Sequence, residues 1–158
     1  MFPFSRRRGE GGFAVGEVLR ISCAAAEARV ARVTSDYVML AWPWGGVDPD
    51  SVRVRWDGTR AFPREPDHPE WHNTPWRIEA DDVRALNVAD VCGVGIPLAQ
   101  VRVRAVRSHR PPADLGRLPR PELTLSVVFL GDEQKPAAGF DLPLPCAEPL
   151  VVEHRDAP

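Results

Sequence analysis

Residues 27–42 (EARVARVTSDYVMLAW) hold two runs of β-prone side chains separated by a polar Ser-Asp pair. Branched and aromatic residues favour strands and polar pairs favour turns, so this pattern predicts an antiparallel hairpin. One face of that hairpin is nearly all apolar and the other is mixed, which is typical of a hairpin with one buried face. The predicted cross-strand pairs are Val33 with Val38 and Ala31 with Leu40.

Residues 51–62 (SVRVRWDGTRAF) predict a second hairpin, with its turn at Asp57 and Gly58. The tight turn requires a positive φ that glycine adopts without strain. A two-residue loop would place Arg55 opposite Arg60, a repulsive pair. A bulged, three-residue loop places Trp56 opposite Arg60 and allows a cation–π contact, so we favour the bulged register.

Residues 13–22 and 75–88 add a first strand and a closing strand, the latter followed by a helical turn that Asp81 or Asp82 caps. A strand, two hairpins and a short turn before a closing strand resemble the small SH3-like barrels in outline, over roughly the first 90 residues. We therefore expect a mainly β protein with little helix, built as a small SH3-like barrel or a strongly bent antiparallel sheet.

The second half predicts further strands at 96–108, 121–131 and 148–155. The proline-rich segments 108–121 and 131–149 between them predict loops. The expected organisation is a disordered arm at 1–12, a barrel-like unit at 13–90 and a second set of strands at 91–158. We expect the second set to pack on the first as one compact domain.

Composition limits the classes of partner. The 20 basic and 22 acidic residues give a net charge of −2, which offers no global attraction to nucleic acid or to an anionic membrane. Lys135 is the single lysine, and a chain rich in arginine, proline and alanine indicates a GC-rich, bacterial genome. The arginines near the amino terminus lack a following apolar run, so we expect a cytoplasmic protein.

Residues 65–76 (EPDHPEWHNTPW) are the first candidate site, because His68 and His72 are four residues apart. On a helix that spacing lets two imidazoles share a zinc ion. Three prolines in the segment make such a helix improbable. We expect an extended loop fastened by Trp71 and Trp76, with the histidines as surface contacts and as weak metal candidates only.

Residues 41–46 (AWPWGG) are the second candidate site. Trp42 and Trp44 point to the same face of a strand, where they form either an aromatic slot for a proline-rich or cationic ligand or part of the core. Both alternatives stay open, and we count the two tryptophans as candidate binding residues.

A run of arginines forms the third candidate site. It contains Arg102, Arg104, Arg107, Arg110, Arg117 and Arg120. Such a stripe suits phosphate groups. Residues 65–90 carry seven acids, however, and pairing of the arginines with these acids is the competing interpretation.

Signatures of catalysis are scarce. Cys23, Cys92 and Cys146 show no CxxC spacing, which argues for free thiols rather than disulfides or zinc. We expect a non-enzymatic binding or accessory protein without a cofactor, which engages a protein or peptide through Trp42, Trp44, Arg55, Arg60, Arg102 and Arg104. The alternatives are a nucleic-acid-binding module that uses the arginine run and an enzyme that depends on a metal at the histidines or on the thiol of Cys92.

Overall fold

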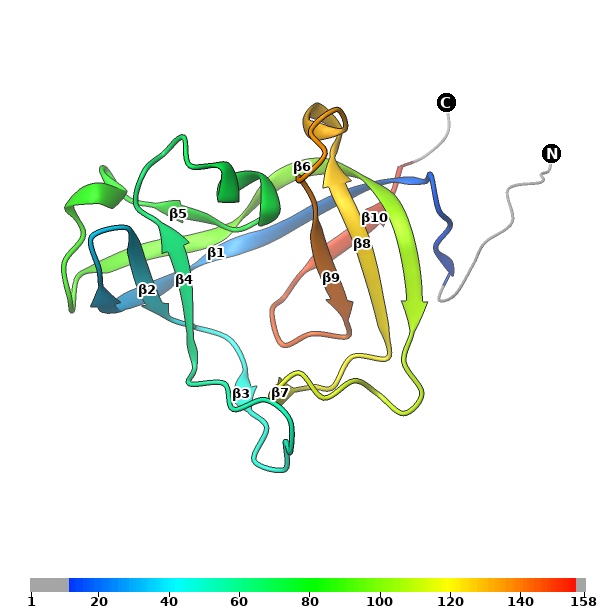
Figure 1. Ribbon diagram of the computed structural model, residues 1–158, viewed down its shortest axis with the longest axis horizontal. Coiled ribbons are helices and arrows are strands. Elements are labelled where there is room, and N and C mark those ends of the chain that lie inside the picture. Colours follow the sequence, from blue (N-terminus) through cyan, green and yellow to red (C-terminus); the bar gives the residue numbers. More distant parts are fainter. Residues whose placement is uncertain (1–11, 156–158) are drawn as a thin grey trace.

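Two long, curved antiparallel strands form the frame of the fold (Figure 1). A computed structural model describes residues 12–155, in which these strands are β1 (Val18–Val33) and β6 (Val91–Ser108). The register between them shifts twice, between Ile21 and Cys23 and between Cys23 and Ala26. Such irregularities bend a strand and increase its twist, so the two strands curve and pair with different strands along their length.

The shorter strands pair along this frame to give one antiparallel sheet. The main path runs β4-β2-β1-β6-β8-β9, with β10 paired to the early part of β1 and β5 paired to β6. The bounds are β2 (Tyr37–Ala41), β4 (Thr59–Pro63), β5 (Arg77–Glu79), β8 (Leu123–Phe129), β9 (Phe140–Leu144) and β10 (Val151–His154). A separate two-stranded ladder joins β3 (Gly46–Val47) to β7 (Arg117–Leu118).

The prediction of a mainly β, antiparallel protein is confirmed. Helical structure between residues 12 and 155 comprises short 3-10 turns, among them η2 (Pro69–Asn73), η3 (Val83–Ala85) and η4 (Leu130–Asp132). No helix in this part of the chain is long and apolar enough to cross a membrane. The sheet is bent but does not close into a barrel, because β4 and β9 each have one paired neighbour within residues 12–155.

The first predicted hairpin forms, with a shift in register. Val33 lies opposite Val38, as expected, but Leu40 lies opposite Val30 because the register shifts at Ala31. The extra residue keeps Val30 and Leu40 on the buried side of the pair, where both are almost inaccessible. The bulge therefore preserves the apolar face that predicted the hairpin.

The second predicted hairpin is wrong. Its later half forms β4, but β4 pairs with β2, while residues 51–56 form a loop. Ser51 fixes this loop through its hydroxyl, which donates to Asp114 Oδ1 at 2.6 Å. The turn at Gly58 does form, with φ at +86°. Since residues 51–56 are not a strand, the predicted contact between Trp56 and Arg60 is absent, and the Arg117 guanidinium lies 4.6 Å from the Trp56 ring instead.

The second half agrees more closely with its pattern. The strand predicted at 96–108 lies within β6, and those predicted at 121–131 and 148–155 contain the shorter β8 and β10. Asp82 caps η3 by accepting from the Arg84 amide. Two strands were missed, the two-residue β7 and β9, because both lie in segments that prolines made resemble loops. β9 is an edge strand, and an edge tolerates the missing amide of proline. The predicted arm at 1–12 lies outside the described residues except for Gly12.

Close packing of β6 on β1 gives a first prediction. A Cβ atom at Gly95 would lie 2.8 Å from Ala25 Cα and 2.8 Å from the Cys23 carbonyl oxygen, both of them backbone atoms. We expect Gly95→Ala to lower the free energy of unfolding by about 1–3 kcal/mol, because two strands must separate. Gly46→Ala is the matched control, since a Cβ there meets no atom within 4 Å. Equal urea midpoints for the two variants would contradict the prediction.

Candidate functional site

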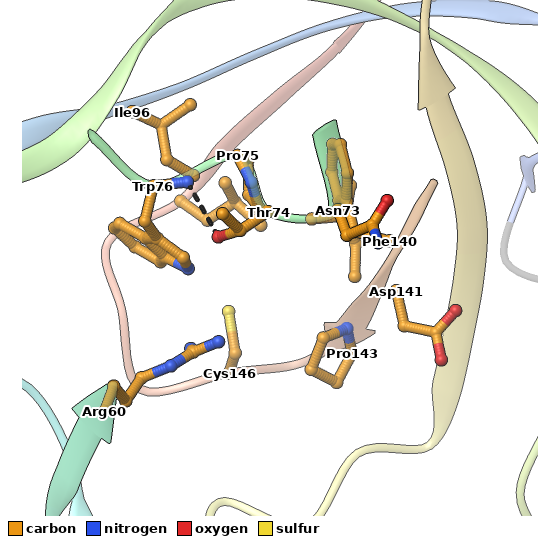
Figure 2. A pocket seen from close by; sticks show the side chains of 12 residues that line it. Arg60, Asn73, Thr74, Pro75, Trp76, Ile96, Phe140, Asp141, Pro143 and Cys146 are labelled. Carbon is orange, nitrogen blue, oxygen red and sulfur yellow. Dashed lines mark hydrogen bonds between the residues drawn. The ribbon is translucent and has the colours of Figure 1, made fainter. Parts of the chain in front are cut away.

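A pocket opens between the edge strands β4 and β9 (Figure 2). Its volume is about 320 Å³. Figure 2 shows Arg60, Trp76 and Cys146 around one end of it, with Pro143 and Asp141 of β9 farther along. The lining residues are Arg60, Asn73, Thr74, Pro75, Trp76, Ile96, Phe140, Asp141, Leu142, Pro143, Cys146 and Leu150.

Arg60 brings a positive charge to this pocket from the core-facing side of β4. The pairing of β4 with β2 sets Arg60 opposite Leu40 and Phe62 opposite Val38, and those three apolar neighbours are buried. Because side chains two apart share a face of a strand, Arg60 points to the same side as Phe62. An arginine thus occupies a position where the strand pattern places an apolar side chain.

The Arg60 guanidinium has no anionic partner within residues 12–155. It lies 4.8 Å from the centroid of the Trp42 ring, a cation–π contact, and it makes no hydrogen bond or ion pair to the described residues. Burial lowers the pKa of Arg60, and the nearby Glu148 charge partly opposes that effect. The side chain stays charged at neutral pH, because arginine deprotonates only far above that range.

Glu148 bonds to the indole N–H at the edge of the Trp42 ring. Its carboxylate accepts from Trp42 Nε1 at 2.6 Å and from an Arg117 terminal nitrogen at 2.6 Å, and the residue is only 6% exposed. Burial acts to raise the pKa of Glu148, but the bonds from Trp42 and Arg117 outweigh it and the pKa is lowered. Two arginines and one glutamate leave one unbalanced positive charge at this end of the pocket.

The two predicted slot tryptophans lie behind the pocket rather than in it. Trp42 is 8% exposed and packs edge-on against Trp76 at 4.9 Å and against Trp44 at 5.4 Å. Trp44 is half-buried. Neither ring lines the pocket, so the aromatic surface that a ligand meets there is Trp76.

Asp141 carries a negative charge at the opposite end of the pocket (Figure 2). Its side chain is 57% exposed and pairs with Arg107 at 3.2 Å. Ser126 Oγ donates to the same carboxylate at 2.9 Å. The two ends of the pocket therefore differ in charge. Its inner end carries the Arg60 cation, which has no ion pair among residues 12–155, and its rim carries the solvent-exposed Asp141 carboxylate.

Most arginines of the predicted stripe are engaged within the molecule. Arg102 pairs with Glu133 at 2.5 Å, and Arg104 donates to the carbonyl oxygens of Ala138 and Glu133. The acidic partners are not those expected from residues 65–90. The ion pairs are Arg102 with Glu133, Arg107 with Asp141, Arg117 with Glu148 and Arg120 with Asp48. Arg55 is exposed on the 51–56 loop and does not line the pocket.

The histidines of residues 65–76 turn to different partners. His68 Nδ1 accepts from the Glu70 amide at the start of η2, and His72 Nδ1 lies 2.9 Å from Asp132 Oδ2. No group of three or more His, Cys, Asp or Glu within residues 12–155 is arranged to hold a metal ion. The segment is anchored by its tryptophans as expected, but residues 69–73 form a 3-10 turn rather than an extended chain. Pro69 fits the first position of that turn, where its missing amide costs nothing.

The cysteines are free, and the pKa of each thiol is raised by burial. Cys92 lies in β6 and is 7% exposed, so its thiol is buried, whereas the alternative of a thiol-dependent enzyme requires an accessible one. Cys146 lines the pocket, and burial together with Glu148 raises its pKa to about 11. Neither thiol is ionised at neutral pH, and the thiolate is the nucleophilic form.

This environment gives a second prediction for Cys146. At pH 8 a thiol with a pKa of about 11 is ionised in roughly one molecule per thousand, against roughly one in ten at the ordinary value of 9.0. We expect iodoacetamide to label Cys146 about 100-fold more slowly in the native protein than in guanidinium chloride. Peptide mapping by mass spectrometry measures the rate at this thiol. Equal rates in the two conditions would contradict the raised pKa.

Sequence reasoning named Arg60, Trp42 and Trp76 but did not predict that they meet, and it gave no signal for the other residues around the pocket. Cys146 and Glu148 lie in a segment that composition marks as a proline-rich loop, and Phe140 and Leu142 belong to the missed strand. A pairing across 106 residues, as between Trp42 and Glu148, leaves no local pattern. Comparisons with models of protein families, with curated proteins and with solved structures each give no match for this chain.

Proposed function

We propose that this is a non-enzymatic binding or accessory protein that engages a protein or peptide partner through the pocket between β4 and β9. The observation that carries the proposal is the Arg60 guanidinium, which reaches the pocket without an anionic partner among residues 12–155. Glu148 lies near Arg60 but is bonded to Arg117 and Trp42, so the half-buried Arg60 charge makes no ion pair of its own within residues 12–155, and a bound anion would supply one. The site thus gains stability from a ligand.

The remaining arginines favour this proposal over the nucleic-acid alternative. Arg102, Arg104, Arg107, Arg117 and Arg120 bond to acids or carbonyl groups of the chain itself. A phosphate stripe requires arginines that are free to displace counterions along a surface. A pocket of about 320 Å³ lies at the small end of the range for ligand sites and admits one end of a peptide. The predicted cytoplasmic setting and the outline of an SH3-like barrel remain parts of this proposal.

Affinity selection from a soluble random pentapeptide library tests the proposal. The library contains free-acid and amidated carboxyl ends in equal amounts, and retained peptides are identified by mass spectrometry. We expect the native protein to enrich a set of peptides that Cys146→Leu loses, since the larger side chain reduces the pocket volume. Unchanged melting of Cys146→Leu is the control for folding. Enrichment that is the same for both proteins, or no enrichment by the native protein, would contradict a peptide-binding pocket.

A further inference from the structure

We infer that this pocket recognises a single carboxylate at the end of an apolar group, as found at the carboxyl terminus of a peptide that ends in an apolar residue. The inference deepens the proposed function and rests on it. The inner cation, the apolar wall and the acidic rim each restrict the chemistry of the occupant.

The charge at the inner end fits a monoanion. Arg60 and Arg117 face one carboxylate, that of Glu148, which Arg117 and Trp42 already occupy. One positive charge therefore remains to be balanced. A guanidinium offers parallel N–H donors that match the two oxygens of a carboxylate. A phosphate dianion would bring a second negative charge into a poorly hydrated site with no cation to balance it, and such a charge is strongly disfavoured.

The wall of the pocket fits an apolar carrier for that carboxylate. Its apolar side chains come from four parts of the chain, namely Ile96 of β6, Phe140 and Leu142 of β9, Trp76 before β5 and Leu150 before β10. Apolar contact here strengthens binding roughly in proportion to the area removed from water. A ligand whose last side chain is polar would lose the hydration of that side chain against this apolar wall.

The rim sets the orientation. Asp141 lies at the opposite end from Arg60 and is already paired with Arg107, so the rim offers no free cation among the described residues and an anion is attracted to the inner end (Figure 2). The Trp42 ring positions the Arg60 guanidinium by a cation–π contact. Glu148 in turn fixes that ring by accepting from its indole N–H. We therefore assign Trp42 and Glu148 as positioning residues and Arg60 as the residue that contacts the ligand.

The same chemistry occurs in two sources, a peptide terminus and a free branched carboxylic acid. Calorimetric titration with four probes separates them. The probes are acetyl-Gly-Ala-Leu with a free carboxylate, the same peptide as its amide, acetyl-Gly-Asp-Ala-Leu amide, and isovalerate. Titrations at low and moderate ionic strength keep the charge contribution measurable.

We expect the free-acid peptide to bind about 10- to 100-fold more tightly than its amide, the range that a charge-assisted hydrogen bond supplies. Arg60→Gln removes this difference. Arg55→Gln is the matched control, because it deletes an exposed arginine outside the pocket and leaves the difference intact. Melting curves of both variants exclude unfolding as the cause.

The outcomes distinguish the carboxylate-terminus inference from the proposal of a peptide-binding pocket. Equal binding of acid and amide peptides, or tighter binding of the internal aspartate peptide, overturns the carboxylate-terminus inference while a peptide pocket stands. Binding of isovalerate without binding of any peptide supports carboxylate recognition and overturns the peptide partner. An acid-over-amide preference that survives Arg60→Gln overturns the role of Arg60. Absence of binding by all four probes overturns the inference, and the library selection then tests the peptide pocket on its own.

Discussion

Trp42→Ala is expected to lower the free energy of unfolding by about 3–5 kcal/mol, the range for truncating a buried tryptophan. The ring is 8% exposed and contacts Trp44, Phe62 and Trp76, so its removal opens a cavity at the centre of the aromatic cluster. Urea unfolding followed by fluorescence of the remaining tryptophans measures the loss. Far-ultraviolet circular dichroism provides a second probe of the same transition.

Trp42→Phe separates packing from the hydrogen bond. Phenylalanine retains much of the apolar ring but cannot donate to Glu148, so we expect a loss of about 1–3 kcal/mol, the cost of an unsatisfied buried group. A loss below about 1 kcal/mol for Trp42→Ala would contradict a core position for this side chain. Such a result would instead favour the alternative in which Trp42 belongs to an exposed aromatic slot.

Glu148→Ala is expected to cost about 3–5 kcal/mol, because it leaves a buried cation without its partner. Arg117 loses the 2.6 Å ion pair, Trp42 loses its acceptor, and Arg60 loses the nearest compensating charge. The double variant Glu148→Ala, Arg117→Met removes the pair together. We expect it to be more stable than Glu148→Ala alone, and an equal or lower stability would contradict the buried ion pair.

The same carboxylate gives the protein part of its acid sensitivity. The pKa of Glu148 is lowered in the folded state, so its contribution to stability is complete above the ordinary value of 4.5 and is lost as the pH falls from there through the folded pKa. Melting temperatures at pH 7 and at pH 3 measure this loss. Glu148→Gln should lose less stability over that interval than the native protein, and an equal loss would contradict a lowered pKa.

Local patterns predicted the strands whose apolar and polar residues alternate and missed those that tertiary contacts create. The hairpin at 27–42 and the strand at 121–131 were predicted because each carries a row of apolar side chains along one face. The strand at 51–56 was wrong because β2, already apolar on its inner face, offered β4 a better partner than the arginine-rich 51–56 run. β9 was missed because its proline, Pro143, is tolerated only at an edge, and edge position is not visible in the sequence.

The site was predictable only in part for the same reason. Arg60 was named from an expected contact with Trp56, yet its neighbour is Trp42, which follows β2 and lies 18 residues earlier in the chain. The ion pairs of the arginine stripe use Glu133, Asp141, Glu148 and Asp48, which are spread across the sequence. Composition reported how many charges the chain carries, but only the fold decides which of them remain unpaired.

The Nε–Hε resonance of Arg60 tests the central claim most directly. It is assigned by its absence from the spectrum of Arg60→Lys and followed in ¹⁵N-labelled protein during titration with the free-acid peptide acetyl-Gly-Ala-Leu and with its amide. The predicted result is a saturable shift of the Arg60 resonance, together with shifts of β4 and β9 amides, with the acid and not with the amide. No shift of that resonance at saturating peptide, or shifts confined to exposed arginines such as Arg55, would contradict a carboxylate-binding pocket between the two edge strands.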